Sequence, residues 1–276
     1  MNIILRPGRV PFKFEGPDAQ KLLRDVLTGT VVAEPGFAAH WWALLTPQGK
    51  IVAEGLLGWQ DGAFWLDVDA GIAPNFFKRM RMYKLRADAE ISDLSGTHSV
   101  GWSKDEPNLE NAIVHADPRT GGLGFRVISK QDAAKGWGAN SNAFTTRRVA
   151  AGVVELGADF ESETLFPHDI GMDLLGGIDF KKGCYVGQEV VSRMRHRGTA
   201  RRRPVIISGA VPGPEHEIMA EGKSVGQIGA VVGGQAIGIL RLDRLRPDSE
   251  ATLNSKPVKL AVPRWASYDF GDSGKT

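Results

Sequence analysis

The sequence has little cysteine and no long apolar run. Its 276 residues contain one cysteine, Cys184, so an intrachain disulfide and a cysteine-rich zinc site are both excluded. Low cysteine use is typical of a reducing compartment. The apolar run before Arg6 has only three residues, too few for a secretory signal, and later runs fall far below the roughly 18–20 residues of a membrane span. We therefore expect a cytoplasmic protein that makes no membrane contact.

Excess charge of one sign is also lacking. The 34 lysines and arginines against 32 aspartates and glutamates give a net charge of +2, too small to indicate a polyanionic partner for the whole protein. The six histidines are scattered, with no pair at the spacing of metal ligands. The sequence predicts no metal site, and any basic surface must be local.

The first third of the chain predicts an α+β layer, since strands are followed by a helix and another strand. Its expected elements are a strand at 9–14, a helix at about 18–27, a three-stranded meander between 40 and 69, a helix at 71–83 and a strand at 85–93.

The remainder is less regular until the C-terminus. Strands are expected near 101–102 and 123–128, a helix from about Ser141 to Gly152, and a long ordered connection over 158–180. Residues 189–197 alternate, which favours a strand over a short helix. Beyond residue 204, short strands between Gly and Pro turns predict a small β-barrel of roughly 65 residues.

One stretch, Gly177–Arg203, carries the strongest functional signal. Cys184 lies between Gly183 and Gly187, and glycines let a backbone turn tightly or approach a ligand closely. A buried structural thiol is the common alternative for a free cysteine. Here the flanks are not apolar, and the neighbouring lysines and arginines would favour the thiolate form.

Six arginines follow this cysteine within eleven positions, from Arg193 to Arg203. They are consistent with a solvated face, with nucleic-acid backbone binding, or with bidentate recognition of a carboxylate or phosphate ligand. No aromatic residue interrupts the run, which disfavours nucleic acid. Separately, Phe144 and Arg148 lie one helical turn apart and could hold a flat heterocycle that bears carboxylates, although core packing would also explain Phe144.

Residues 181–189, K-K-G-C-Y-V-G-Q-E, resemble the signature of YgfZ-type folate-binding proteins, which are relatives of the glycine-cleavage T-protein (aminomethyltransferase). The resemblance extends over nearly the whole chain, including T-P-Q-G-K-I-V-A-E at 46–54, D-P-R-T-G-G-L-G-F-R at 117–126 and V-V-S-R-M-R-H-R-G at 190–198. It implies an α+β protein, a three-lobed ring of two intertwined α+β lobes and a C-terminal antiparallel β-barrel around a central folate channel.

The resemblance also implies how the chain divides among the lobes. A discontinuous α+β lobe would comprise 1–39 and 94–203 and carry the cysteine motif, and a second lobe, 40–93, would be inserted into it. Residues 204–266 would form the barrel and 267–276 a flexible tail.

The function implied is that of a tetrahydrofolate-binding factor that assists assembly, maturation or repair of iron–sulfur enzymes. Cys184 would be the functional thiol, with Lys182 and Tyr185 shaping its surroundings. Gln188 and Glu189 would order the loop or contact a ligand.

Tetrahydrofolate, or a one-carbon derivative of it, would be the cofactor. Phe144 would face its ring, and Arg148 with Arg193 or Arg197 would clamp its glutamate tail. The expected partners are iron–sulfur enzymes or cluster-assembly proteins, bound transiently by a monomer.

The chain departs from the T-protein pattern at functional positions. The catalytic aspartate matches Ala53, with Glu54 beside it, and the pterin-recognising acid matches Gly122. Gly29-Thr30 replaces Asn-Asp, and Ala150 replaces a glutamate. Aminomethyl transfer needs an acid to handle protonation of the folate nitrogen, so these losses argue against it. A folate-dependent aminomethyl- or methyltransferase, an RNA-binding module that uses the arginine run, and a non-catalytic folate scaffold stay as alternatives.

Overall fold

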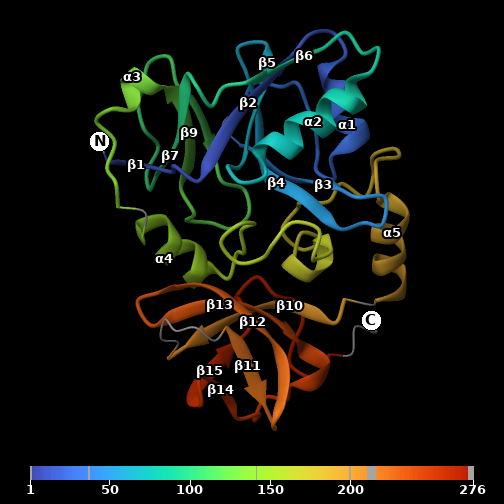
Figure 1. Cartoon of the computed structure of the whole chain (residues 1–276), viewed down its shortest axis with the longest axis vertical. Coiled ribbons are helices and arrows are strands. Elements are labelled where there is room, and N and C mark those ends of the chain that lie inside the picture. The colour runs from blue at the N-terminus through green and yellow to red at the C-terminus, as the bar shows by residue number, and fades with distance from the viewer. Residues whose placement is uncertain (1, 37, 141, 199, 210–215, 273–276) are drawn as a thin grey trace.

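The computed structural model describes residues 2–36, 38–140, 142–198, 200–209 and 216–272. Two sheet-containing lobes lie side by side, and a β-barrel packs below both of them (Figure 1). The predicted α+β class with a C-terminal barrel is confirmed. Among the described residues, no helix is both long and apolar enough to cross a bilayer.

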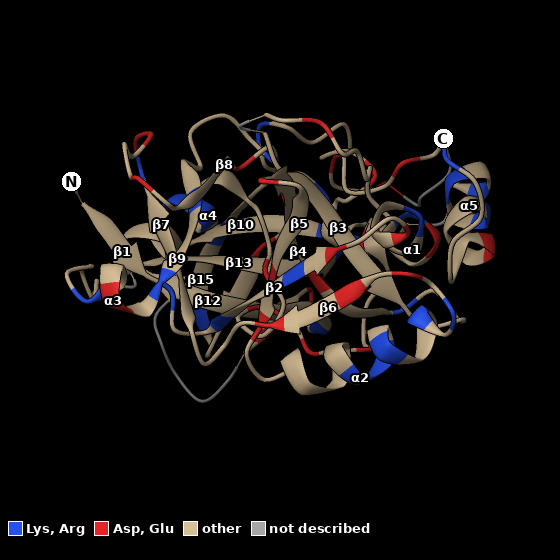
Figure 2. Ribbon diagram, turned by 90° about the horizontal axis from the view of Figure 1, so that it is seen from above, with Lys and Arg blue, Asp and Glu red and all other residues tan. Residues whose placement is uncertain are grey.

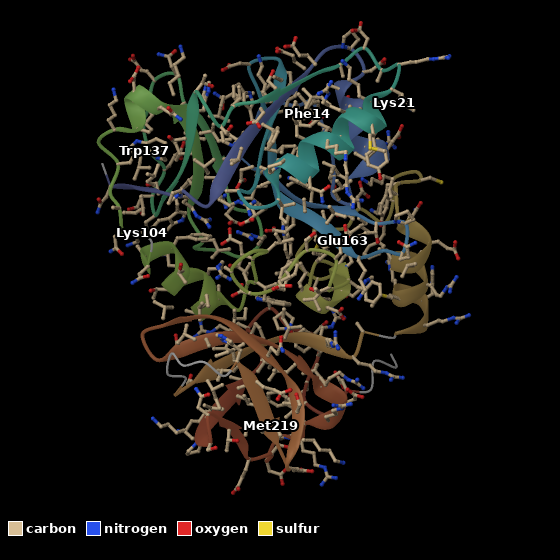
Figure 3. All side chains as sticks on the ribbon, viewed as in Figure 1. Phe14, Lys21, Lys104, Trp137, Glu163 and Met219 are labelled. Atoms are coloured by element: carbon tan, nitrogen blue, oxygen red, sulfur yellow. The ribbon has the colours of Figure 1, made fainter. Side chains whose placement is uncertain are left out.

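The first lobe contains a five-stranded antiparallel sheet covered on one face by two helices. The sheet order is β3-β4-β5-β2-β6, with β2 Arg9–Glu15, β3 His40–Leu45, β4 Ile51–Gln60, β5 Ala63–Asp69 and β6 Glu90–Asp93. The helices are α1 (Ala19–Val26) and α2 (Ala73–Lys84). Phe14, which is fully buried, lies between this sheet and the helices (Figure 3).

This sheet includes residues that precede residue 40, where the inserted lobe was expected to begin. Strand β2 pairs with both β5 and β6, for example Phe12 with Leu66 and with Asp93. Phe12 and Phe14 pack against Phe76 of α2, and α1 joins the same core. Residues 9–26 therefore belong to the first lobe, together with the segment 40–93 that was expected to form the inserted lobe. The alternating apolar side chains of β2 complete the buried face of this lobe's sheet.

The second lobe has a four-stranded sheet and two helices. Its order is β1-β7-β9-β8, with β1 Ile3–Leu5, β7 His98–Ser103, β8 Ile113–Ala116 and β9 Phe125–Lys130, and its helices are α3 (Gln131–Ala134) and α4 (Asn142–Ala151). Helix α4 agrees with the expected helix at 141–152, although Ser141 lies outside the described residues. The connection 158–180 contains only the short helix η1 (Pro167–Ile170).

The C-terminal strands close a barrel, as expected. Its order is β10-β13-β12-β11-β14-β15, with β10 Arg202–Ser208, β11 Glu217–Ala220, β12 Lys223–Val232, β13 Gln235–Arg241, β14 Ala251–Leu253 and β15 Lys256–Ala261, and the short helix η2 (Leu242–Arg244) follows β13. A second core, which includes Trp41 and Leu45 of β3, extends through the 165–178 connection to Ile237 and Ile239 of the barrel. This core attaches the barrel to the first lobe.

Two expectations about the C-terminal third are corrected by the structure. Residues 188–197 form a helix, α5 (Gln188–Arg197), rather than a strand. The tail from 267 is attached in its described part, since Tyr268 donates a hydrogen bond to the Pro204 carbonyl at 2.8 Å and Phe270 packs on the barrel core. Residues 273–276 lie outside the described part.

Candidate functional site

Cys184 is exposed on the loop that leads into α5. The loop is shaped by Asp179, whose backbone N–H donates to the Thr28 carbonyl at 2.9 Å. The Asp179 carboxylate accepts backbone hydrogen bonds from Lys181 at 2.9 Å and Lys182 at 3.2 Å. These bonds turn the chain sharply just before the thiol, which they leave facing solvent.

Lys182 anchors this loop from within the protein. Its side chain is buried, and Nζ donates to the carbonyls of Leu27 and, at 2.9 Å, Gly29. Burial lowers the pKa of Lys182 to about 8, although the nearby Asp179 carboxylate opposes the shift. The ammonium also lies 4.8 Å from the ring centre of Tyr185, which is buried in the second core. Lys182 and Tyr185 thus do lie around Cys184, as positioning residues of its loop.

Gln188 and Glu189 begin helix α5. Gly187 precedes them at φ +79°, and a Cβ there would lie 2.7 Å from the Thr46 carbonyl oxygen, so the entry to the helix requires glycine. The Gln188 N–H donates to the Tyr185 carbonyl at 3.2 Å. Glu189 is exposed and ion-paired with Arg193, one turn along the helix. The Gln188 bond is made by its backbone, so the ordering role of the two side chains stays a prediction.

Helix α5 escaped detection because it buries little. Val191 is its buried residue, and Val190 packs against Gly49, where an added Cβ would lie 2.9 Å from the valine Cβ. Because the apolar stripe is so narrow, the sequence shows no 3.6-residue repeat of apolar residues, and the two adjacent valines instead favour a strand. Gly198 at φ +56° ends the helix.

The residues predicted to hold folate are not brought together. Helices α4 and α5, which carry Arg148 and Arg193, lie on opposite sides of the molecule (Figure 1). Phe144 is buried against Trp102, with the Arg6 guanidinium 4.0 Å over its ring. Its ring is covered on the faces where a pterin would stack.

Arg148 is likewise committed to the protein itself. It is 1% exposed, donates to the Val153 carbonyl at 2.8 Å, and pairs with Asp159 and, at 3.5 Å, with Glu155. Arg193 is paired with Glu189, and Arg197 is exposed at the far end of α5. The four residues therefore do not fit tetrahydrofolate in this arrangement.

A buried ionic network between the two lobes was not foreseen from the sequence. Five arginines face five carboxylates: Arg6, Arg9, Arg119, Arg126 and Arg148, with Glu54, Asp67, Asp117, Glu155 and Asp159. The two sets balance in charge. Only the positions of charged residues inside otherwise apolar strands, such as Asp67 in A-F-W-L-D-V-D, could have indicated it.

Asp67 is the centre of this network. Its carboxylate is fully buried, accepts from Arg9 Nε at 2.6 Å, and also pairs with Arg126. Burial alone would raise the pKa of Asp67, but Arg126 and Arg9 lower it below its ordinary value. Glu54 accepts from Trp41 Nε1 at 2.7 Å and from Arg9 at 3.3 Å. The network links β2, β4, β5 and β9 to one another. Its carboxylates are already paired with arginines.

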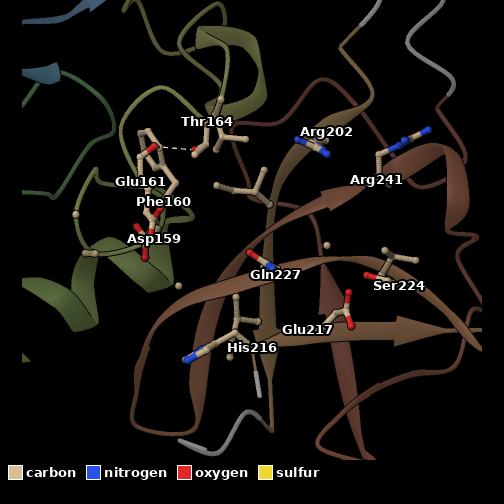
Figure 4. Close-up of a pocket in the computed structure, with 18 of the residues that line it drawn as sticks. Asp159, Phe160, Glu161, Thr164, Arg202, His216, Glu217, Ser224, Gln227 and Arg241 are labelled. Atoms are coloured by element: carbon tan, nitrogen blue, oxygen red, sulfur yellow. Dashed lines mark hydrogen bonds between the residues drawn. The ribbon is translucent and has the colours of Figure 1, made fainter. Parts of the chain in front are cut away.

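A polar cavity of about 750 Å³ separates the 157–165 segment from the barrel wall. Figure 4 shows Asp159, Phe160 and Glu161 on one side and Gln227 with Ser224 on the other. Asp159 is not free to bind a ligand, because it pairs with Arg148 and accepts the Ala230 N–H at 2.9 Å. Cys184 does not line this cavity.

The solved aminomethyltransferase T of the glycine cleavage system from Bartonella henselae superposes with a TM-score of 0.71 at 14% identity, over 98% of this chain and 87% of that one. The fold is that of an aminomethyltransferase. Residues 200–268 match the family model described as the C-terminal β-barrel domain of CAF17.

The curated relatives are named as iron–sulfur cluster assembly factors. The chain is 34% identical to the "iron-sulfur cluster assembly factor IBA57 homolog, mitochondrial" of Neurospora crassa, over 93% of this chain and 61% of that protein. It is 26% identical to the mouse "iron-sulfur cluster assembly factor IBA57, mitochondrial", over 94% and 83% respectively. The chain spans 56 to 61% of the length of the first three fungal relatives. These names overturn the expected cytoplasmic location, since the relatives are mitochondrial proteins.

Ala53 and Glu54, the two positions compared with the catalytic aspartate of the T-protein, are both enclosed by the protein. Ala53, which matches the catalytic aspartate, is 1% exposed in the core of the first lobe. Glu54 points to the opposite face of β4 and is held by Trp41 and Arg9. Neither position supplies a free acid.

Proposed function

We propose that this protein assists the assembly or repair of iron–sulfur clusters and that Cys184 is its functional thiol. The observation that carries the proposal is one exposed cysteine on a loop anchored by a buried lysine. Similarity to iron–sulfur cluster assembly factors along 93% of the chain supports it.

The role proposed for the thiol follows from the fact that the sequence contains one cysteine. Iron–sulfur clusters are held by several thiolates, and this chain has one cysteine. Cys184 therefore acts on a cluster jointly with ligands from another protein or from a small thiol, as one ligand during transfer. The exposed loop lets such a donor approach, and the anchored backbone holds the sulfur in place.

Tetrahydrofolate is implied by the resemblance to YgfZ-type proteins. The residues named for it are buried or lie on opposite sides of the molecule, so we assign no step to it. Calorimetric titration with tetrahydrofolate tests this directly, and binding at micromolar concentration would require another site.

Complementation of a deletion strain tests the proposal. The strain would receive the wild-type chain, Cys184→Ala, Cys184→Ser or the control Ser95→Ala, which changes an exposed small polar side chain after β6 and leaves the thiol. We expect activities of [4Fe–4S] enzymes to fall in both cysteine variants and to match wild type in the control. Full restoration by Cys184→Ala would exclude the thiol as the functional group.

A further inference from the structure

The charge of this protein is concentrated around Cys184. Residues 181–203 hold eight lysines and arginines against one acid, Glu189, a net of +7, whereas the whole chain carries +2 and its remainder therefore −5. Arg195, Arg197, Arg201 and Arg202 are exposed, and none makes an ion pair within the described residues. Figure 2 shows the basic residues of α5 gathered at one end of the molecule.

Two arginines of this stretch contact neighbouring segments of the protein. The Arg195 guanidinium lies 3.9 Å over the ring of Phe180, on the cysteine loop. Arg203 binds Asp173 with two bonds of 2.7 and 2.9 Å, which fixes the start of β10 to the connection before the loop. These two contacts tie α5 and the start of β10 to the segment that carries the thiol. Arg195 lies about 10 Å along the helix axis from its first residue.

An apolar groove borders the same loop on its other side. It has a volume of about 570 Å³, and its apolar lining comes from Leu22 and Val26 of α1, from Tyr83 and Ala87, and from Val186, two residues after the cysteine. Its charged lining residues, Asp18, Lys21, Asp25 and Arg86, balance in charge. Leu85, beside it, is 86% exposed at a φ of +42°, and Met82 is 63% exposed. Both are close in sequence to Tyr83 of the groove, and apolar surface that adjoins a groove is typical of protein contact sites. A positive φ at leucine is uncommon and strained.

We propose that α5, the Cys184 loop and this groove form one docking surface for an acidic protein partner. The inference rests on the proposed function and names the partner class: a protein with a carboxylate-rich face beside apolar side chains, next to its own cluster ligands. Charge complementarity would steer the encounter, and the groove would supply the desolvated contact. Nucleic acid is disfavoured for two reasons. Its charged backbone would gain little from an apolar groove, and the arginine run contains no aromatic side chain on which a base could stack.

A peptide probe tests the surface without a known partner. The probe is a synthetic helical peptide with glutamates on one face and leucines on the other. We expect wild-type binding by fluorescence anisotropy to weaken as salt rises, and the bound peptide to slow alkylation of Cys184. Arg195→Glu/Arg197→Glu should reduce affinity at least tenfold. The control, Lys78→Glu/Arg81→Glu, makes the same change of charge on α2 and should leave affinity unchanged.

Two further variants separate charge from fold. Arg195→Lys/Arg197→Lys keeps both charges and should bind within a few-fold of wild type. Leu85→Asn removes the exposed apolar group and leaves a non-glycine residue at the same backbone angles, φ +42° and ψ −100°, so binding should fall without loss of thermal stability. Equal binding by the Glu and wild-type chains, or tighter binding of a single-stranded RNA that the same reversal abolishes, would refute the proposal.

Complementation distinguishes this inference from the proposed function. If Cys184→Ala fails and Arg195→Glu/Arg197→Glu fully restores cluster-enzyme activity, the docking surface is refuted and the thiol function stands. If Cys184→Ala restores activity, the proposed function itself fails.

Discussion

Replacement of Lys182 by methionine tests whether a buried ammonium anchors the cysteine loop. The lysine donates to the carbonyls of Leu27 and Gly29, and burial lowers its pKa from 10.5 to about 8. The unfolded chain therefore holds this proton between pH 8 and 10.5 while the folded chain releases it. The unfolding free energy of wild type should rise across this window by about 3 kcal/mol from this group and gain nothing from it below pH 8.

At neutral pH the methionine variant should differ by only about 1–2 kcal/mol. Two hydrogen bonds contribute about 0.5–1.5 kcal/mol each, and their loss is offset because no charge is then buried. The loop should loosen: amide exchange over 181–187 and alkylation of Cys184 should both speed up several-fold.

The assay is urea unfolding at a series of pH values, for wild type, Lys182→Met and the control Lys181→Met, whose side chain is exposed. The stabilisation between pH 8 and 10.5 should disappear in Lys182→Met alone. Parallel pH profiles for Lys182→Met and wild type would show that the ammonium is not buried in the folded protein, and the anchoring argument would be refuted.

Three further outcomes concern the interior. Burial lowers the pKa of His115 to about 4. As the pH falls, the unfolded chain takes up this proton first, so the free energy of unfolding should fall by up to about 3 kcal/mol between pH 6.5 and 4. Urea unfolding of His115→Gln should lack this fall. Asp67→Asn leaves Arg9 without its closest carboxylate and should lose about 3–5 kcal/mol, whereas Asp25→Asn, in an exposed pair, should lose less than about 1 kcal/mol. Gly58→Ala places a Cβ 2.2 Å from the His115 ring and should lower the melting temperature, equivalent to about 1–3 kcal/mol.

Local chemistry made the barrel and the loop of Cys184 predictable. Short apolar strands between glycine and proline turns define the barrel from β10 onward, and Gly183 and Gly187 frame an exposed thiol. Both depend on residues close together in sequence. Strand β2, which lies between β5 and β6, was missed as part of the first lobe because the residues that it pairs with in β5 are 50 to 60 positions away.

Long-range ion pairs left no local signal. Arg6 and Glu155 are 149 positions apart, as are Thr28 and Gly177, which hydrogen bond at 2.7 Å. The one-turn spacing of Phe144 and Arg148 was read correctly, but arginine usually faces solvent, and here it faces inward. Only Asp159, eleven residues later, explains why burial of this guanidinium is tolerated.

The same inward arginines favour the proposed site at the edge of this molecule over one at its centre. An anionic ligand at the centre would compete with Asp159 for Arg148 and with Asp67 for Arg9. Each competition breaks a buried ion pair and leaves a carboxylate uncompensated, at about 3–5 kcal/mol. Among the residues that the structure describes, Arg193 is the one arginine of α5 with a carboxylate partner. An incoming acidic surface can therefore be neutralised there without loss of an existing contact, directly beside the thiol of Cys184.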